Sequence, residues 1–373
     1  MKKSLGIYLH IPFCIKKCGY CDFCSFPKNG TEDIQAYANE LCRRISLTDA
    51  SEHIVDTIYF GGGTPSLLPT ASVNKILNTI SSTFSVDTNA EITLECNPAT
   101  ADLSYFKDIR SMGINRLSMG LQSAIDHELS LLGRAHSFGD FLTCFNSSRA
   151  AGFENVSVDL MYGIPDQTIK TLETSINALC RLSPEHISTY GLSIEENTQF
   201  YRQRATLNLA DDDMQAQMYL LCSQMLSEQN YQKYEISNFA KQGLVSRHNT
   251  RYWKRLDYLG FGVSAHSFFN GERFSSSRDL CAFLDGKDIT DERYSLTDDE
   301  SRQEYIMLSL RLCRGLDTNE YNQLFHRNAL EDLPQMNEYV KQGFMQKNGS
   351  HFCFTDKGFL VSNTLLSDML DFS

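Results

Sequence analysis

Three cysteines near the start of the chain constrain its fold and chemistry more than any other feature. Cys14, Cys18 and Cys21 follow one another at C-x3-C-x2-C spacing, so three thiols fall within one short loop. The loop comes directly after residues 7–11, an apolar run that is expected to form a strand ending at Pro12. Three thiolates this close together are expected to bind metal. The sequence therefore predicts a metal-binding loop at the carboxyl end of the first strand.

The spacing also bears on the kind of metal site. A structural zinc site takes four ligands, often from C-x2-C pairs, whereas three cysteines can hold three irons of a [4Fe-4S] cluster and leave the fourth iron open. The spacing resembles the signature of the radical S-adenosylmethionine (SAM) enzymes, in which the open iron binds SAM. A zinc site and chance spacing are the alternatives. Cys24 has no role that the spacing defines: it could be a spare thiol, a ligand under oxidative damage or a vestige.

Composition indicates a globular protein with a full catalytic domain and a smaller one. The chain has 373 residues and is 42% hydrophobic, and it contains no apolar stretch of the ~20 residues that cross a membrane. The start of the chain has no signal-peptide core, and the cysteines after Cys24 show no pairing pattern, so we expect a reduced, cytoplasmic protein that is not an integral membrane protein. A net charge of -12 argues against a nucleic-acid partner.

Strands and helices alternate along the first half of the chain. The expected strands are residues 7–11, 54–60, 91–95, 116–119, 156–160 and 187–192, and the expected helices between them are residues 32–47, 71–84, 103–112, 138–151 and 168–181. This order predicts an α/β fold with a parallel sheet and right-handed crossovers. Six units rather than eight would make an open, partial (β/α)6 TIM-like barrel, whose active site lies at the carboxyl ends of the strands.

Glycines and polar residues follow these strands. Residues 61–63 are glycines that offer bare backbone groups, which suit the amino group of SAM, although glycines often only make turns. Two carboxylates at strand ends could bind ribose hydroxyls or the methionyl amine, and an amide and a guanidinium could bind ribose and carboxylate; ordinary surface charge or a structural ion pair is the alternative. These four residues are Glu95, Asp159, Gln122 and Arg134.

Longer strings resemble the family of oxygen-independent coproporphyrinogen III oxidase and its heme-chaperone branch. The strings are residues 8–23, 60–66, 95–98, 115–123, 132–136 and 158–168. The resemblance covers almost the whole chain and implies the radical SAM type of barrel. It implies a [4Fe-4S] cluster on Cys14, Cys18 and Cys21, and it implies SAM contacts from Tyr8, Gly62, Gly63, Thr64, Glu95, Gln122, Arg134 and Asp159.

A basic and aromatic segment lies past the sixth strand and a long helix at residues 211–228. Residues 234–240 and the string HNTRYW at 248–253 look like the segment typical of the chaperone branch. Arginines and lysine surround Tyr252 and Trp253, and a tetrapyrrole with anionic propionates binds basic groups, aromatic faces and an imidazole. We expect His248 to contribute to heme ligation, in preference to His10 and His136. A basic surface turn packed by Trp253 is the alternative.

The last part of the chain is expected to be a separate module. A linker rich in charge and serine is predicted at residues 274–299, followed by helices, a hairpin and a final helix, which suggests a winged-helix-like α+β domain. Residues 290–373 hold 14 acidic and 8 basic residues, which disfavours DNA binding, so we interpret the module as a cover or a partner surface. The predicted domains are residues 1–235 for the radical SAM core, 236–290 for a connecting segment and 291–373 for this module.

Two differences from the oxidases favour the heme-chaperone branch of the family. The oxidases carry a further cysteine two residues after the third cluster ligand, where this chain has Phe23, and they carry a long segment ahead of the motif. We therefore predict a heme chaperone that binds the cluster, SAM and heme. Its partners would be heme, heme-requiring membrane or respiratory proteins, and a flavodoxin- or ferredoxin-like electron donor. The alternatives are oxidative decarboxylation of coproporphyrinogen III to protoporphyrinogen IX, and radical SAM chemistry on an unrelated substrate. The sequence leaves open whether SAM is cleaved productively.

Overall fold

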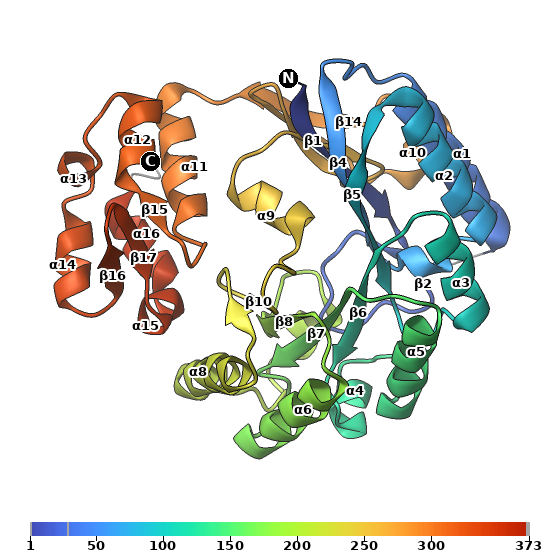
Figure 1. Cartoon of the computed structure of the whole chain (residues 1–373). Helices are drawn as coiled ribbons and strands as arrows, with labels where there is room; N and C mark the ends of the chain where they lie inside the picture. The colour runs from blue at the N-terminus through green and yellow to red at the C-terminus, as the bar shows by residue number, and fades with distance from the viewer. Residues whose placement is uncertain (1, 28–29, 371–373) are drawn as a thin grey trace.

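The computed structural model describes residues 2–27 and 30–370, and its core is one sheet of twelve strands (Figure 1). In spatial order the strands are β14 (Thr290–Ser295), β13 (Glu272–Ser276), β12 (His266–Phe269), β11 (Tyr258–Phe261), β1 (Lys3–Ile11), β4 (His53–Gly62), β5 (Ser85–Cys96), β6 (Arg116–Gln122), β7 (Val156–Tyr162), β8 (His186–Gly191), β10 (Asn238–Ala240) and β9 (Gln232–Lys233). The order ends at β14 on one side and β9 on the other, so the sheet is open.

The predicted alternation of six strands and helices is confirmed. Strands β1, β4, β5, β6, β7 and β8 pair in parallel in that order. The helices that connect them are α1 (Thr31–Ser46), α2 (Thr70–Thr83), α3 (Leu103–Ser111), α5 (Phe138–Ala150) and α6 (Ile169–Leu182), and α8 (Asp212–Glu228) follows β8. A short helix α4 (Asp126–Leu131) and a 3-10 turn, η1 (Pro65–Leu67), are additions that the hydrophobic pattern does not predict.

Burial explains why the first strand reads as a continuous apolar run. Leu5, Ile7, Leu9 and Ile11 on one face of β1 are fully buried, and His10 on the other face is 4% exposed, as expected for a strand covered on both faces in a parallel sheet. The helices pack their apolar faces against the sheet, and α5 and α6 each begin with a capping box that satisfies backbone N–H groups of the first turn. The result is one core that spans the sheet and its helices.

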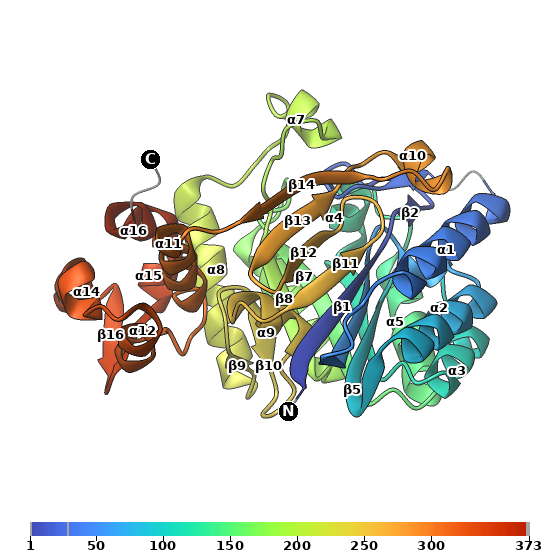
Figure 2. The same ribbon diagram turned by 90° about the horizontal axis from the view of Figure 1, so that it is seen from above.

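Residues 236–290 extend the sheet as well as connecting its two ends. Strand β11 pairs in parallel with β1, on the edge opposite to β4, so that Tyr8 lies beside Gly260. Strands β12, β13 and β14 then continue the sheet in antiparallel fashion, as Figure 2 shows. The prediction of a linker at residues 274–299 is wrong, because β13, β14 and the short helix α10 (Leu280–Leu284) lie in this range. The helix α9 (Arg247–Trp253) precedes β11.

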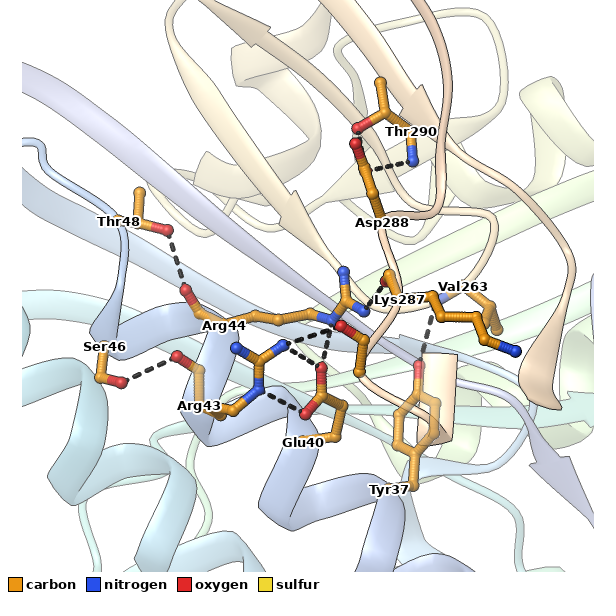
Figure 3. Close-up of polar contacts among 11 residues, drawn as sticks. Tyr37, Glu40, Arg43, Arg44, Ser46, Thr48, Val263, Lys287, Asp288 and Thr290 are labelled. Atoms are coloured by element: carbon orange, nitrogen blue, oxygen red, sulfur yellow. Dashed lines mark hydrogen bonds and ion pairs between the residues drawn. The ribbon is translucent and has the colours of Figure 1, made fainter. Parts of the chain in front are cut away.

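Helix α1 holds these added strands against the barrel (Figure 3). Arg43 and Arg44 both bind Glu40, and Arg44 also donates to the carbonyl of Lys287 at 2.6 Å. The Tyr37 hydroxyl donates to the carbonyl oxygen of His10 at 2.9 Å and accepts from the backbone N–H of Val263 at 3.1 Å. One buried side chain therefore joins β1 to the segment that follows β11.

The C-terminal module has a core of its own and sits beside the sheet, in orange and red in Figure 1. Its strands β15 (Leu316–Asp317), β17 (His351–Phe354) and β16 (Met345–Asn348) form a small sheet. Its helices are α11 (Asp298–Ser309), α12 (Thr318–Phe325), α13 (Ala329–Asp332), α14 (Gln335–Lys341), α15 (Asp356–Leu360) and α16 (Ser362–Met369). Helices around a hairpin match the expected winged-helix-like order. Tyr219 of α8 belongs to the same apolar cluster, and Lys233 pairs with Asp356 at 2.9 Å.

None of the helices in the described part of the chain combines the length and the apolar character that crossing a membrane requires.

Tyr37→Phe tests the junction between α1, β1 and the added strands. The substitution leaves the His10 carbonyl and the Val263 N–H without their buried partner, so the free energy of unfolding is expected to fall by about 1–3 kcal/mol. Denaturant unfolding measures it. Tyr294→Phe, at a side chain that is 48% exposed, is the matched control and should change stability little. An unchanged unfolding midpoint for Tyr37→Phe would contradict this role.

Candidate functional site

The carboxyl ends of the parallel strands open into one cavity of about 1190 Å³. The cysteine loop lines the cavity between two groups of strands: the ends of β4 to β8 on one side, and β11 to β14 together with α11 on the other. All the residues predicted to hold the cluster and SAM border this cavity, and His248 does not. The predicted site residues are therefore gathered at one place, as parallel strands require.

The cysteine loop is held in shape by its own backbone and by two neighbouring segments. Strand β2 (Phe13–Cys14) pairs with β3 (Phe26–Pro27) and closes the base of the loop. The Gly19 N–H donates to the carbonyl of Leu132 at 3.2 Å, and the Gly19 carbonyl accepts from the N–H of Phe200 at 2.9 Å. Cys14, Cys18 and Cys21 are partly exposed toward the cavity, whereas Cys24 is buried.

The donor set around the three thiols fits an iron–sulfur cluster. The Arg134 guanidinium lies 3.7 Å from the sulfur of Cys18, and the Thr64 hydroxyl lies 3.5 Å from the sulfur of Cys14, so two of the three sulfurs have a hydrogen-bond donor of the kind that stabilises thiolate ligands. Burial raises the pKa of the Cys21 thiol to about 11, so a metal must replace its proton.

The geometry of the thiols also bears on the zinc alternative. Within residues 2–27 and 30–370, no three His, Cys, Asp or Glu side chains converge on a point that could hold a single metal ion. A cubane cluster makes no such demand, because each thiolate binds a different iron.

The glycines after β4 serve the packing of the cysteine loop. Gly62 has a φ of 114°, and a Cβ there would lie 2.7 Å from the His10 ring. A Cβ on Gly63 would lie 2.8 Å from the carbonyl oxygen of Phe13, and the Gly63 N–H donates to the carbonyl oxygen of Ile11 at 2.8 Å. The space that these glycines leave is thus filled by the protein, and their backbone forms part of the cavity floor.

Two buried carboxylates face the cavity from the ends of β5 and β7. Burial raises the pKa of Glu95 to about 7 and that of Asp159 to about 6. The charge of Asp159 raises the pKa of Glu95 further, while hydrogen bonds and the nearby Arg116 act to lower both pKa values. Glu95 accepts from the Tyr59 hydroxyl at 2.9 Å and from the Gly62 N–H at 3.1 Å. Acceptors held in place at a partly buried cavity wall suit the hydroxyls and the ammonium group of SAM.

Two arginines and an amide complete this part of the floor. A bulge-like register shift between Gly120 and Gln122 gives Gln122 a φ of 72° and places it on the cavity wall. Arg134 donates to the carbonyl of Gly120 at 2.7 Å, and its Nε is buried without a partner among the described residues. Arg116 is 1% exposed and its Nε also lacks a partner, so this residue, to which sequence reasoning gave no role, is a further candidate for the site.

Tyr8 and His10 connect the cavity floor to the cysteine loop. The Tyr8 hydroxyl and His10 Nδ1 share a hydrogen bond of 3.1 Å, and His10 Nε2 donates to the carbonyl of Cys24 at 2.8 Å. Both nitrogens of His10 are therefore occupied, and burial lowers its pKa. Cys24 contributes its backbone to this link, while its thiol is in the apolar core.

His248 lies inside the protein, in a different setting from the one that the sequence suggests. It is fully buried, Nδ1 shares a hydrogen bond of 2.9 Å with Thr57, and Nε2 shares one of 2.8 Å with the Tyr252 hydroxyl. Glu91 accepts from the N–H of His248 at 3.0 Å at the start of α9. Burial lowers the pKa of His248 to about 3. The imidazole thus offers no unoccupied nitrogen to a heme iron in this conformation.

The basic residues near His248 are also engaged within the protein. Arg251 is 2% exposed and binds Asp56, Ser4 and the carbonyl of Asp257. Arg255 pairs with Glu304 of α11 at 2.7 Å. Residues 248–255, which include the HNTRYW string, therefore connect β4 and the start of β11 to the C-terminal module. Their high density of charge and aromatic residues reflects these contacts.

The twelve-stranded sheet, the βα units and the cysteine loop at the end of the first strand define a protein of the radical SAM class. The model of the Radical SAM superfamily matches residues 8–179, and the model of the HemN C-terminal domain matches residues 296–361. Coproporphyrinogen III oxidase (HemN) from Escherichia coli has a similar structure, with a TM-score of 0.86, 23% identity and coverage of 100% of this chain and 91% of that one.

Sequence relatives narrow this class to one family. The heme chaperone HemW of Bacillus subtilis (strain 168) is 32% identical over 97% of this chain and 98% of its own length. The heme chaperone HemW of Escherichia coli (strain K12) is 32% identical over 97% of both chains. The chain belongs to the HemW family.

The protonation of Glu95 leads to a prediction on SAM affinity. If ionised Glu95 accepts hydrogen bonds from SAM, affinity should fall as pH drops through about 7, by up to about tenfold per pH unit below the pKa. Tyr59→Phe removes a donor that lowers the pKa of Glu95, so the midpoint should move to higher pH. Glu95→Gln should bind SAM weakly, and its affinity should not change with pH. Isothermal titration calorimetry of SAM binding to the reconstituted protein between pH 6 and about 8.5 measures these affinities. A wild-type affinity that does not change with pH would contradict the prediction.

Proposed function

We propose that this chain is a heme chaperone that binds a [4Fe-4S] cluster, SAM and heme, and delivers heme to heme-requiring membrane or respiratory proteins. The observation that carries the proposal is the match to heme chaperones along nearly the full length of both chains, at 32% identity. The cavity supports it, because its volume of about 1190 Å³ exceeds the ~300–1,000 Å³ of a typical small-molecule pocket. Such a cavity has room for SAM at one end and a second flat ligand at the other.

In this proposal Cys14, Cys18 and Cys21 hold the cluster, whose open iron binds SAM and can supply it with an electron. The chain's own residues orient the SAM molecule. Glu95 and Asp159 accept hydrogen bonds from its hydroxyl and ammonium groups, and Gln122 and Arg134 bind ribose and carboxylate. Tyr8, Gly62, Gly63 and Thr64 complete the surface on which SAM rests, all of them on the cavity wall.

The alternative function, oxidation of coproporphyrinogen III, has weaker support. A likeness at 23% identity concerns the fold, whereas the full-length relatives near 32% identity are named heme chaperones. The position where the oxidases of the family carry a fourth cysteine is Phe23, which is 70% exposed at the cavity. A phenyl ring cannot replace the chemistry of a thiol at this position.

The remaining partners follow from the same proposal. A flavodoxin- or ferredoxin-like protein in the cytoplasm would reduce the cluster, and the acidic C-terminal module would serve as a cover or a partner surface. Glu304 and Leu308 of α11 border the cavity, which supports a role for the module as its cover. Nucleic acid is not among the proposed partners, since the net charge of -12 opposes phosphate contact.

Cysteine variants test the proposed cluster ligands. Cys14→Ala, anaerobically reconstituted, should lose most of its iron and sulfide and the broad visible absorbance of the cluster, because a cubane held by two thiolates is labile. Cys24→Ala, three residues beyond Cys21, should keep both iron and absorbance. Cys281→Ala, at an exposed thiol away from the cavity, is a second control. A Cys14→Ala protein that retained a cluster with an iron accessible to SAM would refute the assignment.

An anaerobic assay tests the proposed function against its alternative. The reconstituted protein is given SAM and a reductant, with coproporphyrinogen III in one sample and heme in the other. We expect stoichiometric heme binding, transfer of heme to an apo-protein acceptor such as a heme-depleted respiratory subunit, and no release of carbon dioxide. Formation of protoporphyrinogen IX with release of carbon dioxide would establish the oxidase activity instead.

A further inference from the structure

Strands β11 to β14 form a wall of the cavity that faces the cysteine loop and carries residues with no assigned role. His266 of β12, Arg273 of β13 and Arg278 just beyond it border the cavity, together with Tyr258 and Tyr294. The cross-strand register pairs His266 with Ser275 and Phe268 with Arg273, so these four side chains share one face of the sheet. This face combines an imidazole, an aromatic ring and a guanidinium.

His266 differs from the other histidine on the cavity wall. His10 is 4% exposed and both of its ring nitrogens are hydrogen-bonded. The His266 side chain is exposed to the cavity, and within the described part of the chain its ring makes no hydrogen bond. His248 and His136 are buried and lie outside the cavity lining. Among the described residues of the cavity, His266 is the imidazole that is open to an incoming ligand.

The cations beside His266 are only partly neutralised by the protein. Arg273 binds Glu304 at 2.6 Å and the Tyr258 hydroxyl at 3.4 Å, and its Nε is buried without a partner. Arg278 is 65% exposed and has only a distant contact of 3.9 Å with Asp22. Arg278 lowers the pKa of His10, after the larger effect of burial, so its charge lies near the cysteine-loop side of the wall.

This arrangement fits the chemistry of an iron porphyrin. Such a ligand is a flat apolar disc that needs a nitrogen or sulfur ligand for its iron, cations for its two carboxylates, and aromatic or apolar surfaces for its faces. The segment that the sequence points to, around His248, has its imidazole and its arginines occupied by internal contacts. On the wall of β11 to β14, an imidazole, two guanidinium groups and two tyrosine rings border the cavity: His266, Arg273, Arg278, Tyr258 and Tyr294.

We propose that His266 is the axial ligand of the heme iron and that Arg278, with Arg273 behind it, pairs with the heme propionates, so that heme lies in the same cavity as the cluster and SAM. The inference rests on the proposed heme-binding function and names its site. Heme would then lie between the cysteine loop and the β12–β13 hairpin, where binding of SAM and binding of heme can influence each other.

Hemin titration of the full-length protein tests the ligand. His266→Ala should shift the ferric Soret band of the complex and weaken hemin binding by about tenfold or more, and added imidazole should restore the wild-type band. His266→Met should give a different, methionine-type spectrum. His127→Ala, at a histidine that is 70% exposed and distant from the cavity lining, is the matched control and should behave as wild type. An unchanged Soret band and affinity in His266→Ala would overturn the inference.

Arg278→Gln tests the propionate contact without altering the iron ligand. Its affinity for hemin should fall by about tenfold, because a charge-assisted hydrogen bond is lost, while its affinity for hemin dimethyl ester should stay at the wild-type value. An equal loss for both compounds would contradict carboxylate pairing. A wild-type protein that binds no hemin would refute the proposed function itself, whereas hemin binding that His266→Ala and Arg278→Gln both leave intact would refute only the site.

Discussion

The pairing of β1 with two parallel neighbours is the constraint on which the rest of the structure depends. β4 lies on one side of β1, and β11, some 250 residues later, lies on the other. The cysteine loop leaves the carboxyl end of β1, so it stands between the strand ends that carry Glu95 and Asp159 and the wall that carries His266. Tyr37 reinforces this junction by bonding to both His10 and Val263. One strand thereby brings two candidate ligand sites to a single cavity.

Burial sets the electrostatic character of that cavity. Glu95 and Asp159 have pKa values near 7 and 6, so they are poised between neutral and charged forms around physiological pH. Arg116 and Arg134 supply buried positive charge next to them, each with an unpartnered Nε. These groups are costly to bury alone, and polar ligands that hydrogen-bond to them would offset that cost. The pattern is typical of a binding site and unusual for a structural core.

Much of the fold could be predicted from sequence because its elements are local. The six strands are apolar runs followed by polar or glycine-rich turns, and the helices between them keep a helical apolar spacing, so each βα unit is legible by itself. Strands β11 to β14 were missed since they are short and partly polar; Thr290–Ser295 is exposed along its length. The buried setting of His248 could not be predicted for a related reason. Its partners Thr57 and Glu91 lie more than 150 residues away, and no local pattern reports that such a basic, aromatic string is buried. His266 carries no motif that would single it out; its open position is visible only in the assembled cavity.

The most direct test of the account is to locate iron in crystals of the reconstituted protein grown anaerobically with SAM and hemin. Anomalous scattering at the iron edge distinguishes cluster iron from heme iron by position. We expect a cluster beside Cys14, Cys18 and Cys21 and one further iron within bonding distance of His266, in the same cavity. Heme iron bound at His248, or on the outer surface of the protein, or anywhere away from the β11 to β14 wall would contradict the claim that one cavity holds both the cluster and the heme.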